Sequence, residues 1–349
     1  MEKYIGLDVH AASCTAAVMD ARGKKLGSYV IETNGQALVE FFRTQTGNLH
    51  VCMEEGTQAG WLVEILSPHV ADAVVAMVAD SRGQKSDKHD AFGLAERLRT
   101  RAIEKSVYKI VGSFATLRQL VKVHRTIVQD TVRVQNRIRA LFRARGVSVV
   151  GSRVYAKAER EDSLRQLPAS SRAAAEILFE QYDALCQTRD RAHKDLVAES
   201  HKHAVTKQLE TCPGVGEVRA AQIAAVVVTP DRFRTRQQFW SYCGLGIVMR
   251  SSSDWVQAPN GSWTRATLRQ TRGLNRNHNS LMKQVFKGAA VSVIRQHPDD
   301  PLRKDYERLL AAGTKPNLAQ LTLARKIASI TLAMWKKKEV YKPAATSSP

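Results

Sequence analysis

The stretch KYIGLDVH, residues 3–10, decides the architecture of the first part of this chain. It is a β-favouring apolar run that stops at a carboxylate, Asp8. Two further β-like runs follow, CTAAVMD (14–20) and LGSYVIE (26–32), separated by the turn sequence DARGKK. The chain therefore opens with three predicted strands, and the first of them carries an acidic side chain at its end.

The residues that follow alternate between helical and strand patterns. Helices are predicted near 35–45, 59–66 and 87–100, and strands at LHVCME (49–54) and VVAMVA (74–79). Three strands, then helix, strand, helix, strand and helix form a mixed α/β layer pattern.

Acidic side chains recur at the ends of these elements. Asp8 and Glu54 each end an apolar strand, while Asp87 and Asp90 are three apart in a helix and share a face, with Cβ atoms about 5–6 Å apart. Glu55 competes with Glu54, and strand alternation allows only one of the two to point at a common site. Carboxylate oxygens suit Mg²⁺, and two such ions about 3.5–4 Å apart can clamp the attacking and leaving oxygens of a phosphodiester.

A ribonuclease-H-like sheet would bring these groups together, because its first and fourth strands are neighbours. A later helix can then place two more carboxylates over the strand ends. Four carboxylates this close repel one another, and a bound metal relieves that repulsion. We therefore expect a Mg²⁺ site at Asp8, Glu54, Asp87 and Asp90.

From Phe114 to Arg145 the pattern changes to a heptad repeat typical of a coiled coil. The predicted seam consists of Leu117, Leu120, His124, Ile127, Thr131, Val134, Ile138 and Leu141. The other faces carry Arg118, Lys122, Arg125, Arg133, Arg137, Arg139, Arg143 and Arg145. A second helix is predicted near 170–205, after a loop near 146–153 that turns the chain back. The basic faces are either solvated, or they form a nucleic-acid-facing surface or a dimer arm.

A third region starts near Cys212 with CPGVGEVRAAQIAAVV (212–227), a glycine turn that leads into an apolar helix. Free amide groups at such a helix start suit a phosphate, as in the helix-hairpin-helix motif, and the alternative is a plain connection between two helices. Helices are predicted near 235–243, 275–296, 301–312 and 316–338, with a hairpin around Pro259-Asn260-Gly261. The stretch RGLNRNHN (272–279) either contacts a nucleic-acid backbone or caps a helix at Asn277 or Asn279.

Composition favours a polyanionic partner, because 53 Lys and Arg stand against 33 Asp and Glu for a net charge of +20. No apolar run approaches the ~20 residues of a membrane-spanning helix. The N-terminus enters a strand pattern at once, without a secretory leader, so we expect a cytoplasmic protein. The five cysteines are scattered without a CxxC pair, which predicts buried free thiols.

Taken in order, these motifs resemble the DEDD transposases of bacterial insertion sequences, which include the bridge-RNA-guided recombinases. IGLDVH, CMEEGT and SDKHDAFGLAERL are similar to the family's three acidic motifs, which places its D, E, D and D on Asp8, Glu54, Asp87 and Asp90. PGVGEVRAAQIAA, FWSYCGLG and the serine cluster resemble motifs of its C-terminal domain. The resemblance extends to about residue 340.

The resemblance implies a RuvC-like metal-binding catalytic domain (1–105), a helical coiled-coil linker or dimerisation arm (106–208), a C-terminal transposase domain (209–340) and a disordered tail (341–349). It also implies a serine that attacks DNA and forms a phosphoserine link. Counting from Gly244-Leu245 places this serine at Ser252, with Ser251 and Ser253 as alternatives in register.

Further expectations follow from the family. The resemblance implies that DNA is the substrate; Arg250 and Arg272 are candidate charge stabilisers only because they lie near the serines in the sequence. The resemblance further implies a structured guide RNA, Mg²⁺ as cofactor, a homodimer or homotetramer, and a location at the nucleoid. This chain departs from the family pattern at Gly246-Ile247, where a proline is usual, and in the long stretch 254–272.

Three other hypotheses remain. A RuvC-like junction nuclease would use water as nucleophile, and a non-catalytic nucleic-acid-binding protein would use only the basic helices and the glycine turn. An actin-like sugar kinase would need glycine and a hydroxyl residue just after the aspartate, whereas Val-His-Ala follows Asp8.

Overall fold

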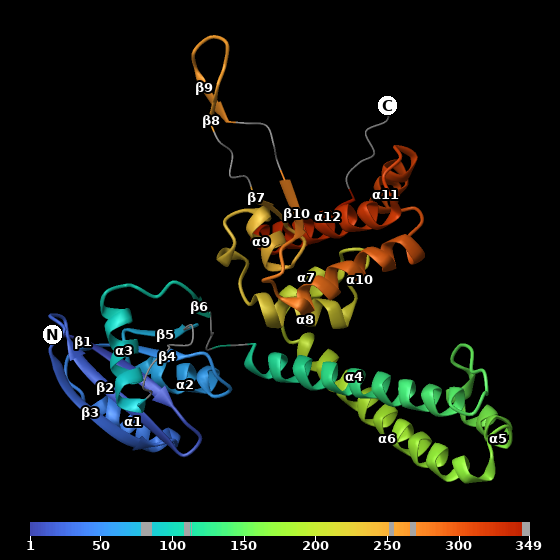
Figure 1. Cartoon of the computed structure of the whole chain (residues 1–349), viewed down its shortest axis with the longest axis horizontal. Coiled ribbons are helices and arrows are strands. Elements are labelled where there is room, and N and C mark those ends of the chain that lie inside the picture. The colour runs from blue at the N-terminus through green and yellow to red at the C-terminus, as the bar shows by residue number, and fades with distance from the viewer. Residues whose placement is uncertain (78–85, 108–111, 113, 251–254, 266–269, 344–349) are drawn as a thin grey trace. The chain divides into compact units, whose positions relative to one another are not determined.

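A mixed six-stranded sheet in the order β3-β2-β1-β4-β5-β6 forms the centre of the first unit, Met1–Ser113 (Figure 1). The second unit is Phe114–Pro349. This computed structural model describes residues 1–77, 86–107, 112, 114–250, 255–265 and 270–343.

The sheet has an antiparallel side and a parallel side. β1 pairs antiparallel with β2, which pairs antiparallel with β3, while β1, β4 and β5 run parallel. The short β6 pairs antiparallel with β5. The strands are β1 (Glu2–Val9), β2 (Ser13–Asp20), β3 (Lys25–Glu32), β4 (Asn48–Glu54), β5 (Asp72–Ala76) and β6 (Ser106–Val107).

Helices cover both faces of this sheet. On one face α1 (Gly35–Thr44) and α2 (Ala59–Leu66) bury apolar residues against alternate positions of β1 such as Ile5 and Leu7. On the other face α3 (Asp87–Arg99) packs through Ala91 and Ala95. Burial of each large aliphatic side chain contributes about 1.5–3 kcal/mol to the stability of the fold. Because successive residues of a strand point to opposite faces, a strand that shifted by one residue would lose this contribution.

The predicted order of three strands, helix, strand, helix, strand and helix is confirmed in this unit. The fifth strand ends at Ala76, earlier than predicted, and 78–79 lie outside the described residues. The two-residue β6 carries no periodic signal and was not predicted.

In the second unit, α4 (Ala115–Arg143) and α6 (Ala169–Ser200) lie against each other as a long helical hairpin (Figure 1). At its closed end are a 3-10 turn, Arg153–Tyr155, and α5 (Lys157–Arg165), where a simple loop was predicted. The buried residues of α4 are Leu117, Val121, His124, Thr131, Val134, Ile138 and Phe142.

The buried stripe of α4 therefore matches the predicted seam at Leu117, His124, Thr131, Val134 and Ile138. The predicted seam residues Leu120, Ile127 and Leu141 are only half-buried. Instead, α4 buries Val121 and Phe142, which follow Leu120 and Leu141 in the sequence. The buried face of the helix is therefore turned slightly from the predicted seam. Spacings of three and four residues are compatible with either position of the buried face. Packing against the partner helix determines which one is buried.

Several of the basic residues predicted on the outer faces of this region have partners within the hairpin. Arg133 pairs with Asp130 at 2.8 Å. Arg139 donates to the Gly151 carbonyl, and Arg145 donates to Ser171 Oγ at 2.8 Å. Part of the positive charge of this region is therefore used in contacts within the hairpin.

The remaining helices share one apolar core. They are α7 (Ala204–Glu210), α8 (Glu217–Val227), α9 (Arg236–Tyr242), α10 (Ser280–Gln296), α11 (Pro301–Ala311) and α12 (Pro316–Lys337), with a 3-10 turn at Pro230–Arg232. Two small ribbons complete the unit: β7 (Ile247–Arg250) with β10 (Gln270–Leu274), and β8 (Trp255–Gln257) with β9 (Trp263–Arg265).

Two sequence predictions in this region can be judged locally. The hairpin at Pro259-Asn260-Gly261 is confirmed, since it joins β8 to β9. The helix predicted from 275 begins instead at Ser280, where Asn279 caps it by accepting from the Met282 amide at 3.1 Å. The capping alternative for RGLNRNHN thus holds at Asn279.

The glycine turn between α7 and α8 is fixed from inside. Arg219 donates to the Gly214 carbonyl at 2.8 Å and to Ser292 Oγ of α10 at 3.0 Å. Burial lowers the pKa of this guanidinium. The turn is therefore bound to α10 by a half-buried cation.

All five cysteines are free, and four of them are buried, as predicted. Burial raises the pKa of Cys52 and of Cys212 to about 12, so both thiols are uncharged at neutral pH. Within the described parts of the chain, no helix has the length and apolar character needed to cross a membrane.

Candidate active site

Asp8 stands at the end of β1 on the face that α3 covers. Ile5 and Leu7 point to the opposite layer, so Gly6 and Asp8 face α3 by alternation. The Asp8 side chain is 19% exposed, which leaves it accessible but partly desolvated. The strand therefore presents a carboxylate at the edge of a buried layer.

Gly6 sets how closely α3 approaches β1. A β-carbon at this position would stand 1.8 Å from the Ala91 carbonyl oxygen and 2.7 Å from the Ala95 amide nitrogen. Only glycine permits this contact between a strand and a helix backbone. With small residues on the facing side of α3, the helix lies directly over the strand that carries Asp8.

The first turn of α3 contains both aspartates of the helical pair. Ser86 caps the helix by accepting from the His89 amide at 3.2 Å, and Asp87 and Asp90 follow it. Acidic side chains are favourable at a helix N-terminus, because the free amide groups there carry partial positive charge. Local helix physics thus helps to place two carboxylates at this end of α3.

Among the residues that the structure describes, Asp8, His10 and Asp87 form a cluster of possible metal ligands. His10 Nε2 lies 3.3 Å from Asp8 Oδ2 and 3.6 Å from Asp87 Oδ1. One ligand atom from each residue lies within 4.8 Å of the others. The structure therefore brings together two of the four predicted carboxylates and adds an imidazole.

The electrostatics of the cluster show crowded negative charge. Burial raises the pKa of Asp8 above its ordinary value, and the charges of Asp87 and Asp90 raise it further. His10 acts in the opposite direction. Asp90 thus lies near enough to interact with Asp8, although it is outside the three-residue cluster.

Glu54 ends β4, the parallel neighbour of β1, and the two strands pair in register up to Leu7 and Met53. Cys52 packs against α3 residues such as Leu94, whereas Met53 packs in the opposite layer. Alternation therefore assigns Glu54 to the face of Asp8, and Glu55 to the other face. Glu54 is exposed and is not part of the Asp8–His10–Asp87 cluster.

The residues present fit a divalent cation. Carboxylate oxygens are the ligands that Mg²⁺ prefers, and one or two of them commonly suffice alongside water and substrate phosphate. Burial, and to a smaller extent the charges of Asp87 and Asp90, raise the pKa of Asp8, and a bound cation would favour its charged form. His10 was not among the predicted site residues, although its position two residues after Asp8 was a signal that the two share a side.

The predicted nucleophile Ser252 lies outside the described residues, as do Ser251 and Ser253. The side chains of Arg250 and Arg272 also lie outside them. What the structure does describe is the base of the ribbon that leads to the serines, where β7 and β10 pair from Ile247 and Leu274 outward.

This base is tied to α12 and to the segment that precedes α10. Arg325 of α12 donates from Nε to the Leu245 carbonyl at 2.8 Å, and the Asn275 amide donates to the Gly246 carbonyl at 3.0 Å. Gly244 has φ +65°, and a β-carbon there would meet the His278 ring at 2.4 Å. The Gly-Leu element before the serine segment is therefore a fixed anchor.

Models of known families match two separate parts of the chain. Residues 5–144 match the model of the DEDD transposases of the IS110 type, described as a transposase. Residues 206–307 match the model of the transposase IS116/IS110/IS902 family. A search of curated proteins gave no match.

The first match contains the carboxylate cluster, and the second contains the anchored ribbon, so both halves are those of a DNA-processing enzyme. The chain belongs to the DEDD transposase family of insertion sequences.

Proposed function

We propose that this transposase cuts and rejoins DNA at an insertion sequence, with a metal site at Asp8, Glu54, Asp87 and Asp90 and with Ser252 as nucleophile. The observation that supports the metal site best is the convergence of Asp8, His10 and Asp87 at the end of β1. The sheet order, with β1 between antiparallel β2 and parallel β4, supports a ribonuclease-H-like (RuvC-like) fold for this unit.

Mg²⁺ at this site would neutralise charge on a phosphodiester and stabilise its leaving oxygen. The carboxylates of Asp8 and Asp87 would hold the ion, and those of Glu54 and Asp90 would complete the ligand set. The His10 imidazole lies between the two aspartates. When a metal binds, it would either move away from them or become a further ligand.

In the proposed chemistry, Ser252 Oγ attacks phosphorus while the bond from phosphorus to the leaving DNA oxygen breaks. The hydroxyl proton passes to a nearby base and the leaving oxygen takes up a proton, so a phosphoserine link joins the protein to one DNA end. Serine is a weak nucleophile at neutral pH and needs such activation. The anchor at Leu245 and Gly246 supports this proposal, because it gives the serine segment a fixed point of departure.

We also propose that a structured noncoding RNA guides the reaction and that the enzyme works as a dimer or tetramer at the nucleoid. Base pairing would then supply the sequence specificity. The net charge of +20 suits RNA and DNA equally, so it supports a polyanion rather than one of the two. Sequencing of the nucleic acid that co-purifies with the protein tests the guide directly.

The test of the serine is a denaturing gel. Purified full-length protein is incubated with DNA that carries the element ends, with Mg²⁺ and with its co-purified nucleic acid. Wild type should give a protein–DNA adduct, Ser252→Ala should give none, and the matched controls Ser251→Ala and Ser253→Ala should retain it. Cleavage by Ser252→Ala without any adduct in wild type would instead indicate a water-dependent junction nuclease.

A further inference from the structure

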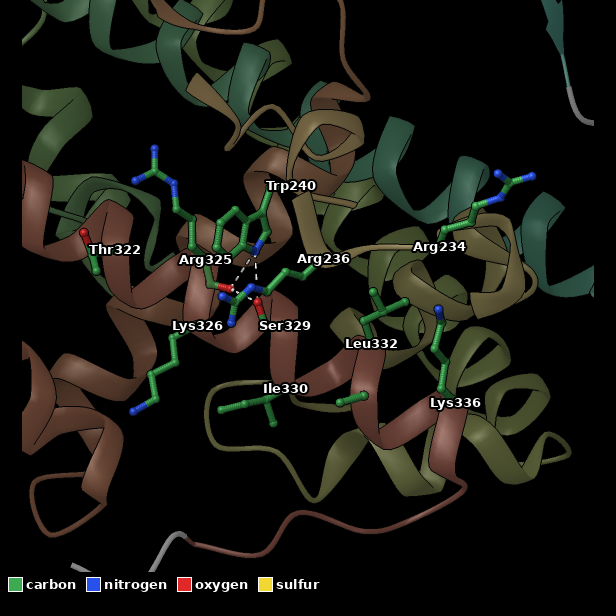
Figure 2. A pocket seen from close by; sticks show the side chains of 11 residues that line it. Arg234, Arg236, Trp240, Thr322, Arg325, Lys326, Ser329, Ile330, Leu332 and Lys336 are labelled. Carbon is green, nitrogen blue, oxygen red and sulfur yellow. Dashed lines mark hydrogen bonds between the residues drawn. The ribbon is translucent and has the colours of Figure 1, made fainter. Parts of the chain in front are cut away.

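A pocket of about 820 Å³ lies in the second unit between α9 and α12 (Figure 2). Basic residues make up much of its lining, namely Arg234, Arg236, Arg325, Lys326 and Lys336. None of the lining residues in the described part of the chain is acidic. A hollow of this size with one sign of charge concentrates potential and attracts anions.

The aromatic wall of the pocket is fixed in place. Trp240 Nε1 donates to the Arg325 carbonyl and to Ser329 Oγ, each at 3.0 Å, which ties α9 to α12. The Arg236 guanidinium lies 5.6 Å from the centre of the Trp240 ring. The wall and its charged edge are therefore organised before any ligand arrives.

The cations of the pocket differ in what already neutralises them. Lys326 forms an ion pair with Asp305, and Arg325 donates to the Leu245 carbonyl. Both side chains therefore have donors already engaged and are less able to bind an anion. Among the residues that the structure describes, no carboxylate pairs with Arg234, Arg236 or Lys336, and Lys336 donates only to the Phe233 carbonyl. Both arginines are exposed, and in Figure 2 Arg236 lies beside Trp240 and Ser329, whereas Arg234 lies to one side of the other lining residues.

We propose that the α9–α12 pocket binds the sugar-phosphate backbone of a nucleic-acid strand, as a contact separate from the carboxylate cluster. The guanidinium groups of Arg234 and Arg236 offer paired donors that match phosphate oxygens. Apolar lining residues such as Ile330 and Leu332 suit the sugar faces between phosphates. The inference rests on the family's action on nucleic acid and is independent of the serine chemistry.

Binding without Mg²⁺ tests the pocket while cleavage is switched off, so its failure is distinguishable from failure of the proposed reaction. The probes are fluorescent strands of ~16 nucleotides, in DNA and RNA of one sequence, and the corresponding DNA duplex. Affinity of the full-length protein is measured by anisotropy across about 0.05–0.2 M salt. The test variant is Arg234→Gln with Arg236→Gln.

Log K falls with log salt, and each phosphate contact to a single strand adds about 0.7 to the steepness of this fall. Two lost contacts should therefore reduce the steepness by about 1.4 and weaken binding about 25-fold near 0.1 M salt. The matched control, Lys287→Gln with Arg295→Gln, removes the same charge from exposed positions of α10 and should lose much less. Arg234→Lys with Arg236→Lys keeps the charge and should retain most of the slope. Circular dichroism verifies that each variant is folded.

A selective loss with DNA alone or RNA alone identifies which nucleic acid uses the pocket, and a loss with both indicates recognition of the backbone in either. Equal losses in the pocket and control variants, or no loss at all, would overturn the proposal. It would also be overturned if the pocket variant kept its nucleic-acid affinity and changed only the oligomeric state in light scattering, because the occupant would then be an acidic protein surface.

Discussion

Replacing Gly6 by alanine should push α3 away from the strand that carries Asp8. The new β-carbon would stand 1.8 Å from the Ala91 carbonyl oxygen. An ordinary van der Waals contact is about 3.4 Å, so the helix must move by roughly 1.5 Å. Because the obstacles at Ala91 and Ala95 are backbone atoms, no side-chain rotation can relieve the clash.

The expected cost is about 1–3 kcal/mol in the free energy of unfolding, the usual range for an overpacked core. The same movement separates Asp87 and Asp90 from Asp8. A displacement of about 1 Å at a reacting centre can reduce rate about 100-fold, so DNA cleavage should fall by at least that factor.

The matched control is Gly93→Ala in α3 itself, where a β-carbon meets nothing within 4 Å. It should stabilise the helix by about 1 kcal/mol, since alanine is the better helix former. Urea unfolding of the full-length variants, with and without Mg²⁺, measures both effects. If Gly6→Ala unfolds like wild type and gains the same stability from Mg²⁺, the contact of α3 with β1 does not form the site.

Two further predictions concern charge and anchoring. Without metal, Asp8→Asn should be more stable than wild type near neutral pH: the pKa of Asp8 is raised on folding, so its favourable contribution exists at low pH and is lost as the pH rises through that pKa. Thermal unfolding at pH 4 and pH 7 should show the stability difference between the two proteins widening with pH, and an equal difference at both pH values would contradict a raised pKa for Asp8 in the folded protein. Arg325→Met should leave the buried Leu245 carbonyl without its donor and cost about 1–3 kcal/mol, while a matched Arg308→Met should cost far less. If the two arginine variants have the same free energy of unfolding in denaturant, the hydrogen bond from Arg325 to Leu245 does not stabilise the fold.

Much of the first unit could be predicted from its residues. Alternation singled out Asp8 at the end of KYIGLDVH and showed that only one of Glu54 and Glu55 can face it, because burial acts on every second residue of a strand. The packing of Cys52 and Met53 in opposite layers then assigns that face to Glu54. The spacing of Asp87 and Asp90 was enough to place them on one helix turn.

Other features depend on contacts that no local pattern records. The role of Gly6 needs knowledge of which helix backbone lies over it, and the place of His10 needs the position of α3. The flank of α4 that includes Val121 and Phe142 is chosen by its partner helix. The pocket at Trp240 joins segments that are more than eighty residues apart in the chain.

The most direct test of the metal site is a crystal structure of the full-length protein with Mn²⁺, read by anomalous scattering. We expect a peak within bonding distance of the carboxylates of Asp8 and Asp87, and no such peak in Asp8→Asn. A peak elsewhere, or none in wild type at saturating Mn²⁺, would contradict the proposal that these carboxylates hold the catalytic ion.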